Sequence, residues 1–113
     1  MKILKDKITL DELKTVAEAR FGDMVKAVVD VERELVAIDA ELHSDLEALL
    51  LEDGSRQKDL WGINLYPDLD LKDLIEFDSM INMRPSQGNR SRGVDSAPAQ
   101  KRILDVVNAW IKR

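Results

Sequence analysis

The stretch from Val25 to Asp39 constrains the fold most, because two β-favouring segments flank the charged run Glu32-Arg33-Glu34. β-Branched residues dominate both segments, and such residues are enriched in strands. We therefore expect a hairpin with strands over 25–31 and 35–39. No Asn-Gly or Asp-Gly pair marks the turn, so a single long bent strand is the alternative interpretation.

A second pair of strands is predicted from residues that alternate in character. In the segment 61–66, Trp61, Ile63 and Leu65 would share one side of a strand, because side chains alternate between the two faces. Alternation resumes over 75–83, after an acidic connection. The two segments are expected to form a second hairpin with one apolar and one largely polar face.

Helices are predicted from capping signals and from apolar residues at helical spacing. The capping-box spacing occurs at Thr9-Leu10-Asp11-Glu12 and again at Ser44-Asp45-Leu46-Glu47. These signals predict helices over 10–21 and about 45–53, each followed by a glycine that favours helix termination. Pro98 fits the first turn of a third helix near the end of the chain.

The expected element order is α-β-β-α-β-β-α, within a single α+β domain over residues 1–113. This order predicts an antiparallel sheet of about four strands, with the helices packed on one face. With 44% hydrophobic and 35% charged residues, the chain has the composition of a globular protein rather than a disordered one.

Charge and composition exclude several classes of function. A formal charge of -5 argues against a nucleic-acid-binding protein, whose surface is normally basic. Without cysteine, the chain has neither disulfides nor thiolate chemistry. The apolar runs are too short for a membrane span or a secretory signal, so a cytoplasmic protein is expected.

The segment Arg84–Gly93 is the strongest candidate for a functional site. It combines three arginines with side-chain amides and hydroxyls and contains no carboxylate. Arginine binds phosphate and carboxylate groups through two parallel hydrogen bonds. We therefore expect an anionic small molecule here, and the candidate ligand-binding residues are Asn64, Asn82, Arg84, Gln87, Asn89 and Arg90.

An alternative interpretation gives the same side chains a structural role. They would hold a long loop to the edge of the sheet by bonding backbone carbonyls, or by pairing with Glu76 and Asp78. Gln87-Gly88-Asn89 matches neither a Walker loop nor a dinucleotide fingerprint, so no cofactor is predicted.

His43 is the only histidine and lies among several acids. It could act as acid or base beside Arg84, which suggests a small phosphate-ester hydrolase or nuclease as an alternative function. A lone histidine with scattered acids is a weak metal-binding signal, and the acids of segment 68–73 lack the glycine and glutamate of a calcium loop. We therefore predict no metal site. We expect the chain to form a homo-oligomer, and a homo-oligomeric interaction module without a ligand is a third interpretation of its function.

Several strings resemble an uncharacterised family of small prokaryotic proteins, a domain of unknown function. The strings are Glu41-Leu42-His43, Leu49-Leu50-Leu51-Glu52-Asp53-Gly54-Ser55, Leu60-Trp61-Gly62-Ile63-Asn64-Leu65-Tyr66-Pro67 and Ile81-Asn82-Met83-Arg84-Pro85-Ser86-Gln87-Gly88-Asn89-Arg90-Ser91. The resemblance implies a small cytoplasmic protein, and it brings neither an established activity nor a catalytic residue.

Overall fold

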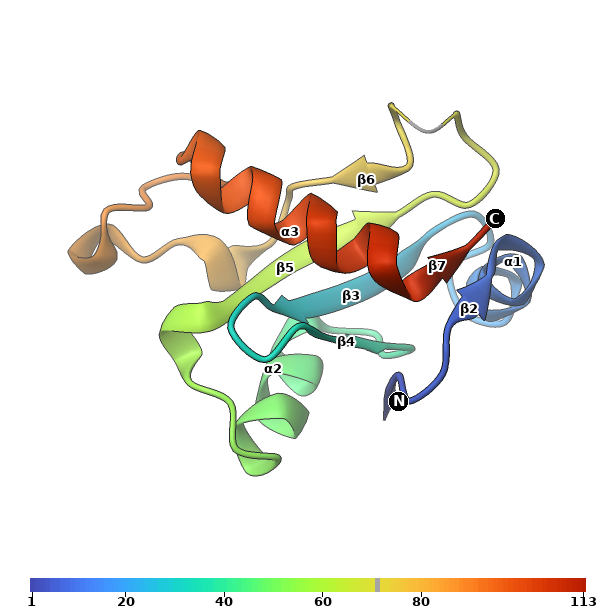
Figure 1. The fold of residues 1–113 in the computed structure, drawn as a ribbon, viewed down its shortest axis with the longest axis horizontal. Helices are drawn as coiled ribbons and strands as arrows, with labels where there is room; N and C mark the ends of the chain where they lie inside the picture. The colour runs from blue at the N-terminus through green and yellow to red at the C-terminus, as the bar shows by residue number, and fades with distance from the viewer. Residues whose placement is uncertain (71) are drawn as a thin grey trace.

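The computed structural model describes residues 1–70 and 72–113 (Figure 1). The strands and α-helices are β1 (Lys2–Ile3), β2 (Ile8–Thr9), α1 (Leu10–Glu18), β3 (Val25–Asp30), β4 (Leu35–Ile38), α2 (His43–Glu52), β5 (Leu60–Leu65), β6 (Ile75–Glu76), α3 (Ala97–Trp110) and β7 (Ile111–Lys112). Short 3₁₀ helices occur at Gln57–Asp59, Met80–Asn82 and Pro85–Gln87.

Five strands form one sheet in the order β1-β4-β3-β5-β6, and every neighbouring pair is antiparallel. This confirms the α+β class and the expected hairpin of β3 and β4. Its turn needs no Asn-Gly pair, because the Asp30 carboxylate accepts hydrogen bonds from the backbone N–H groups of Glu32 and Arg33. Glu34 then takes a left-handed conformation, with φ of 56°.

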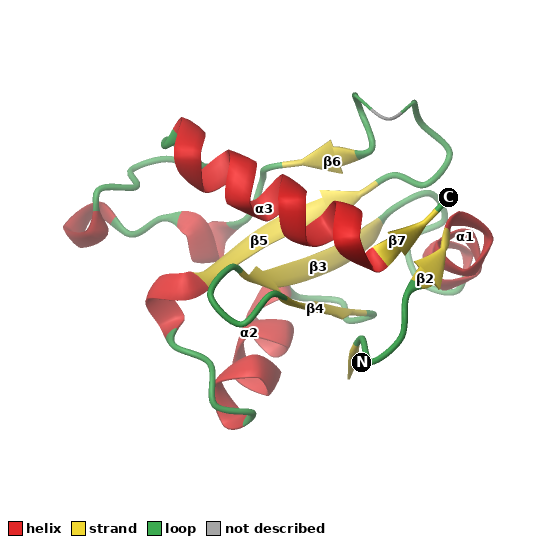
Figure 2. Cartoon of the chain, in the orientation of Figure 1, coloured by secondary structure: helices red, strands yellow, loops and turns green. Residues whose placement is uncertain are grey.

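Helices cover both faces of this sheet rather than one: in Figure 2, α3 lies in front of the sheet and α2 behind it. Helices α1 and α3 pack on one face, where Ala27 and Val29 contribute to the larger core cluster. Helix α2 packs on the other face, where Val28 and Ala37 meet Leu46 in a smaller cluster. The prediction of one covered face was wrong because the β-branched run of β3 is apolar on both sides, a pattern typical of a strand buried on both faces.

The first predicted capping box is present and the second is not. Thr9 Oγ1 accepts a hydrogen bond from the Glu12 N–H at 3.0 Å, and the Glu12 carboxylate accepts from the Thr9 N–H at 3.2 Å. Helix α2 instead begins at His43, after Leu42, which provides no side-chain cap. The start of α2 two residues earlier than predicted places His43 against the sheet.

The predicted strand over 75–83 is also corrected. Only Ile75 and Glu76 pair with β5, and the chain then turns through the 3₁₀ helix Met80–Asn82. The turn brings Ser79 and Asn82 against Gly62, whose lack of a side chain permits the approach. Apolar and polar residues alternate here without a continuous strand.

Candidate functional site

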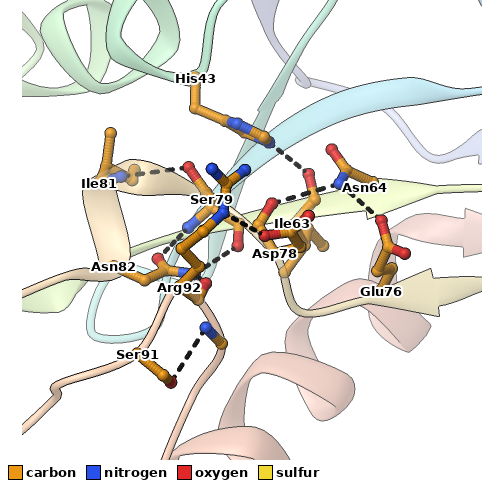
Figure 3. A network of polar contacts seen from close by, with 12 residues as sticks. His43, Ile63, Asn64, Glu76, Asp78, Ser79, Ile81, Asn82, Ser91 and Arg92 are labelled. Atoms are coloured by element: carbon orange, nitrogen blue, oxygen red, sulfur yellow. Dashed lines mark hydrogen bonds and ion pairs between the residues drawn. The ribbon is translucent and has the colours of Figure 1, made fainter.

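A cleft of about 360 Å³ opens on the α2 face of the sheet, where β3, β5 and β6 lie side by side (Figure 3). Its floor and walls carry polar side chains from each of these strands, from the start of α2 and from the loop before α3. The polar lining residues used below are Lys26, His43, Asn64, Tyr66, Glu76, Asp78 and Arg92. Its volume falls within the usual range for small-molecule sites.

The register of the sheet places three of these residues in one row. Asn64 on β5 lies directly opposite Lys26 on β3 and Glu76 on β6. Residues paired in this way share a face of the sheet, and neighbouring strands lie about 4.8 Å apart. The row therefore carries a lysine, an asparagine and a glutamate in sequence.

Asn64 is buried, with 5% of its surface exposed, and one of its polar atoms has no partner. Its Nδ2 donates hydrogen bonds to Glu76 Oε1 at 2.9 Å and to the Asp78 carbonyl at 3.2 Å. These two acceptors fix the orientation of the amide, because a flipped amide would face them with its oxygen. Asn64 Oδ1 is thereby held in the buried wall beside the ring of His43, whose pKa Asn64 raises, and has no well-aligned hydrogen bond from a described residue.

His43 is held in one tautomer. Its Nε2 lies 2.8 Å from the carbonyl oxygen of Ile63, which can only accept, so Nε2 carries the proton and Nδ1 is left as an acceptor. Burial lowers the pKa of His43, and Lys26 lowers it further, against the opposing effects of the Ile63 carbonyl, Asn64 and Asp78. The ring is therefore neutral at physiological pH.

Two further contacts organise the walls. Arg92 Nε donates to Asp78 Oδ1 at 2.7 Å, and this pair is partly exposed, with 53% and 44% of the two side chains accessible. Tyr66 donates its hydroxyl to Glu76 Oε1 at 3.1 Å. Burial and the neighbouring Glu76 carboxylate raise the pKa of Tyr66. Asp78 and Glu76 thus each accept side-chain hydrogen bonds from described residues through one carboxylate oxygen only.

The lowered pKa of His43 predicts a pH dependence of folding. Below the usual value of 6.5 the unfolded chain binds a proton that the folded ring resists, so the free energy of unfolding should fall as the pH drops from about 7 to about 5. His43→Gln keeps a donor for Ile63 and cannot titrate. Chemical denaturation at each pH should show a smaller loss in this variant than in the wild type, and equal losses would contradict the assigned neutral state.

Two of the candidate ligand-binding residues fasten the loop to the sheet instead of lining the cleft. Asn82, fully buried, accepts from the Gly62 N–H at 2.8 Å and donates to the carbonyls of Gly62 and Arg92, both at 2.9 Å. Asn89 Nδ2 donates to three backbone carbonyls, and its oxygen accepts from the Asp95 N–H at 2.8 Å. The structural interpretation therefore applies to both asparagines.

The remaining loop candidates lie outside the cleft. Arg84 is 8% exposed, stacks over Trp61 with its guanidinium carbon 4.3 Å from a ring centroid, and donates to the Gln57 carbonyl. Burial lowers the pKa of Arg84, and its Nε and Nη2 have no partner among the described residues. Gln87 and Arg90 are exposed at the loop surface. His43 and Arg84 therefore do not line a common cleft, and Arg92 is the arginine that joins His43 there.

Of the six candidate ligand-binding residues, Asn64 lines the cleft; Arg92 was expected only as one of the three arginines of the loop, and Lys26 was missed. Lys26 interrupts the apolar run of β3, and this interruption was the available signal. Arg92 could not be singled out among three arginines, because the turns between Asp78 and Arg92 decide which of them reaches the cleft.

Within residues 1–70 and 72–113, no group of three or more histidine, aspartate or glutamate side chains is placed to hold a metal ion. Over the same residues, no helix has the length and apolar character needed to cross a membrane.

Comparison with known proteins agrees with the resemblance noted in the sequence. No curated protein and no solved structure matches the chain. A family model described as "Protein of unknown function (DUF5674)" matches residues 2–110. Because that match spans nearly the whole chain, this protein belongs to the DUF5674 family, a family of unknown function.

Proposed function

We propose that the protein binds a small molecule bearing a carboxylate or phosphate group in the cleft between β3, β5, β6 and α2. The observation that carries this proposal is that two cationic side chains, Lys26 and Arg92, line one cleft together. Lysine and arginine form charge-assisted hydrogen bonds with carboxylate and phosphate groups, and these bonds are stronger than those between neutral groups.

Lys26 and Arg92 supply the attraction for an acidic group. The Lys26 ammonium lies 5.2 Å from the centroid of the Phe21 ring and makes no ion pair with a described residue. Arg92 uses only its Nε in the contact with Asp78, which leaves its terminal nitrogens for a bidentate contact. Both side chains line the same cleft.

In this proposal the loop over 84–93 is a framework that carries Arg92, rather than the ligand site itself. Asn82 bonds the Arg92 carbonyl, and the Ser79 N–H donates to the same carbonyl at 2.9 Å. The backbone of Arg92 is therefore fixed on two sides. Such fixation reduces the entropy that a binding side chain loses when it meets its ligand.

Removing both cations should weaken binding strongly without unfolding the protein. The probe is 4-methylpentanoate, a carboxylate with a short apolar tail, and isothermal titration calorimetry measures its affinity. The double variant Lys26→Gln/Arg92→Gln should bind at least about tenfold more weakly, because contacts to charged groups contribute about 1.5–3 kcal/mol each.

The matched control is Lys58→Gln/Arg90→Gln, which removes the same charges from exposed positions outside the cleft. It should bind the probe as the wild type does. Weakened binding in the control together with normal binding in the cleft variant would place the anion at the loop surface and contradict the proposal. An absence of binding to the wild type would contradict it as well.

A further inference from the structure

We propose that the ligand of this cleft is an α-amino acid with an apolar side chain, so that an ammonium group accompanies the acidic group. This inference rests on the proposed function and extends it, since it names the second group that the cleft recognises and the character of the ligand's side chain.

The first argument is the excess of acceptors on the cleft floor. Glu76 Oε2 and Asp78 Oδ2 receive no hydrogen bond from a described residue, and the buried Asn64 Oδ1 has no neighbouring donor other than the His43 ring. The neutral ring of His43 adds Nδ1 as a further acceptor on the wall. A carboxylate alone carries no proton for these atoms at neutral pH, whereas an ammonium group carries three donors.

The second argument is the order of charge along the row. Lys26 lies on one side of Asn64 and Glu76 on the other, each one strand away. The two charged groups of an α-amino acid are separated by a single carbon. They therefore suit one step between neighbouring strands, with the acid toward Lys26 and the ammonium toward the Glu76 carboxylate, which is hydrogen-bonded to Asn64 in the middle of the row.

The third argument is the apolar rim of the cleft. Leu42 and Met80 line it and are 55% and 62% exposed, although both are large apolar side chains. Met24 and Ile81 are further apolar residues of the lining. Exposed apolar surface beside a polar floor favours a ligand whose own side chain covers it, because burying that surface is favourable.

The test compares three probes by isothermal titration calorimetry with the full-length chain. L-Leucine carries both charged groups, 4-methylpentanoate lacks the amine, and leucinamide lacks the acid. We expect L-leucine to bind at least about tenfold more tightly than 4-methylpentanoate and leucinamide. Glu76→Gln should remove the advantage of L-leucine over 4-methylpentanoate, while Glu52→Gln at the end of α2 should keep it.

The outcomes separate this inference from the proposed function. Equal affinities for L-leucine and 4-methylpentanoate, with weaker leucinamide, would overturn the inference and leave acid recognition in place. Equal affinities for L-leucine and leucinamide would contradict the role of the acid. If no probe binds, both proposals fail. An advantage of L-leucine that survives Glu76→Gln unchanged would overturn the placement of the ammonium group.

Discussion

Replacing Asn82 by alanine is expected to lower the free energy of unfolding by about 3 kcal/mol, although the residue lies in a loop. Its side chain makes the two hydrogen bonds to Gly62 that a neighbouring strand would otherwise make, and a third to the Arg92 carbonyl. The substitution leaves the Gly62 N–H and two carbonyls without these partners in the protein interior. Urea denaturation of the purified variant measures the loss.

Asn108→Ala is the matched control for this prediction. Asn108 is an exposed residue of α3 whose side chain accepts from Arg113, so its loss should change stability by less than about 0.5 kcal/mol. A loss below about 1 kcal/mol for Asn82→Ala would show that water replaces the three contacts. In that case Asn82 would not fasten the loop to the sheet.

Gly62→Ala is expected to destabilise the fold by a similar amount, about 3 kcal/mol, through steric conflict. A β-carbon at this position would lie 2.5 Å from both Cβ and Oγ of Ser79, and 3.1 Å from Cγ1 of Ile81. Because Asn82 bonds both backbone groups of Gly62, the two segments cannot separate without losing those bonds. Thermal and urea unfolding measure the effect.

A double-mutant cycle with Ser79→Gly separates steric conflict from any other cause. Ser79→Gly removes the two closest atoms, Cβ and Oγ, and Oγ also accepts a hydrogen bond from the Ile81 N–H, so this variant must be measured alone. The double variant should then lose less than the sum of the two single changes. Additive losses would contradict the close packing of Ser79 on Gly62.

The sequence predicted best those features that depend on neighbouring residues along the chain. Thr9 and Glu12 form the expected capping box, and the run around Val28 and Val29 forms the expected strand. The same run did not show that both faces of the sheet are covered. Adjacent valines point to opposite sides of a sheet, and the sequence does not distinguish the two sides. Helix α2 occupies the face that was expected to be open.

The errors near Asp78 arise from contacts between distant residues. The alternation over 75–83 is compatible with a strand. In the structure, however, the backbone pairing of β6 with β5 ends at Asn64, and the side-chain amide of Asn82 bonds the backbone of Gly62 in its place. The resulting turns bury Arg84 against Trp61 and carry Arg92 to the cleft. Lys26 joins Asn64 only through the register of β3 and β5, which the sequence does not specify.

The most direct test of the account is to locate binding by two-dimensional ¹H–¹⁵N NMR, titrating labelled protein with L-leucine and separately with 4-methylpentanoate. The account predicts that the largest shifts occur at Lys26, His43, Asn64, Asp78 and Arg92, and that Gln87 and Arg90 at the loop surface move little. Shifts concentrated at Gln87 and Arg90, or shifts by neither probe in the cleft, would contradict the claim that this cleft is the ligand site.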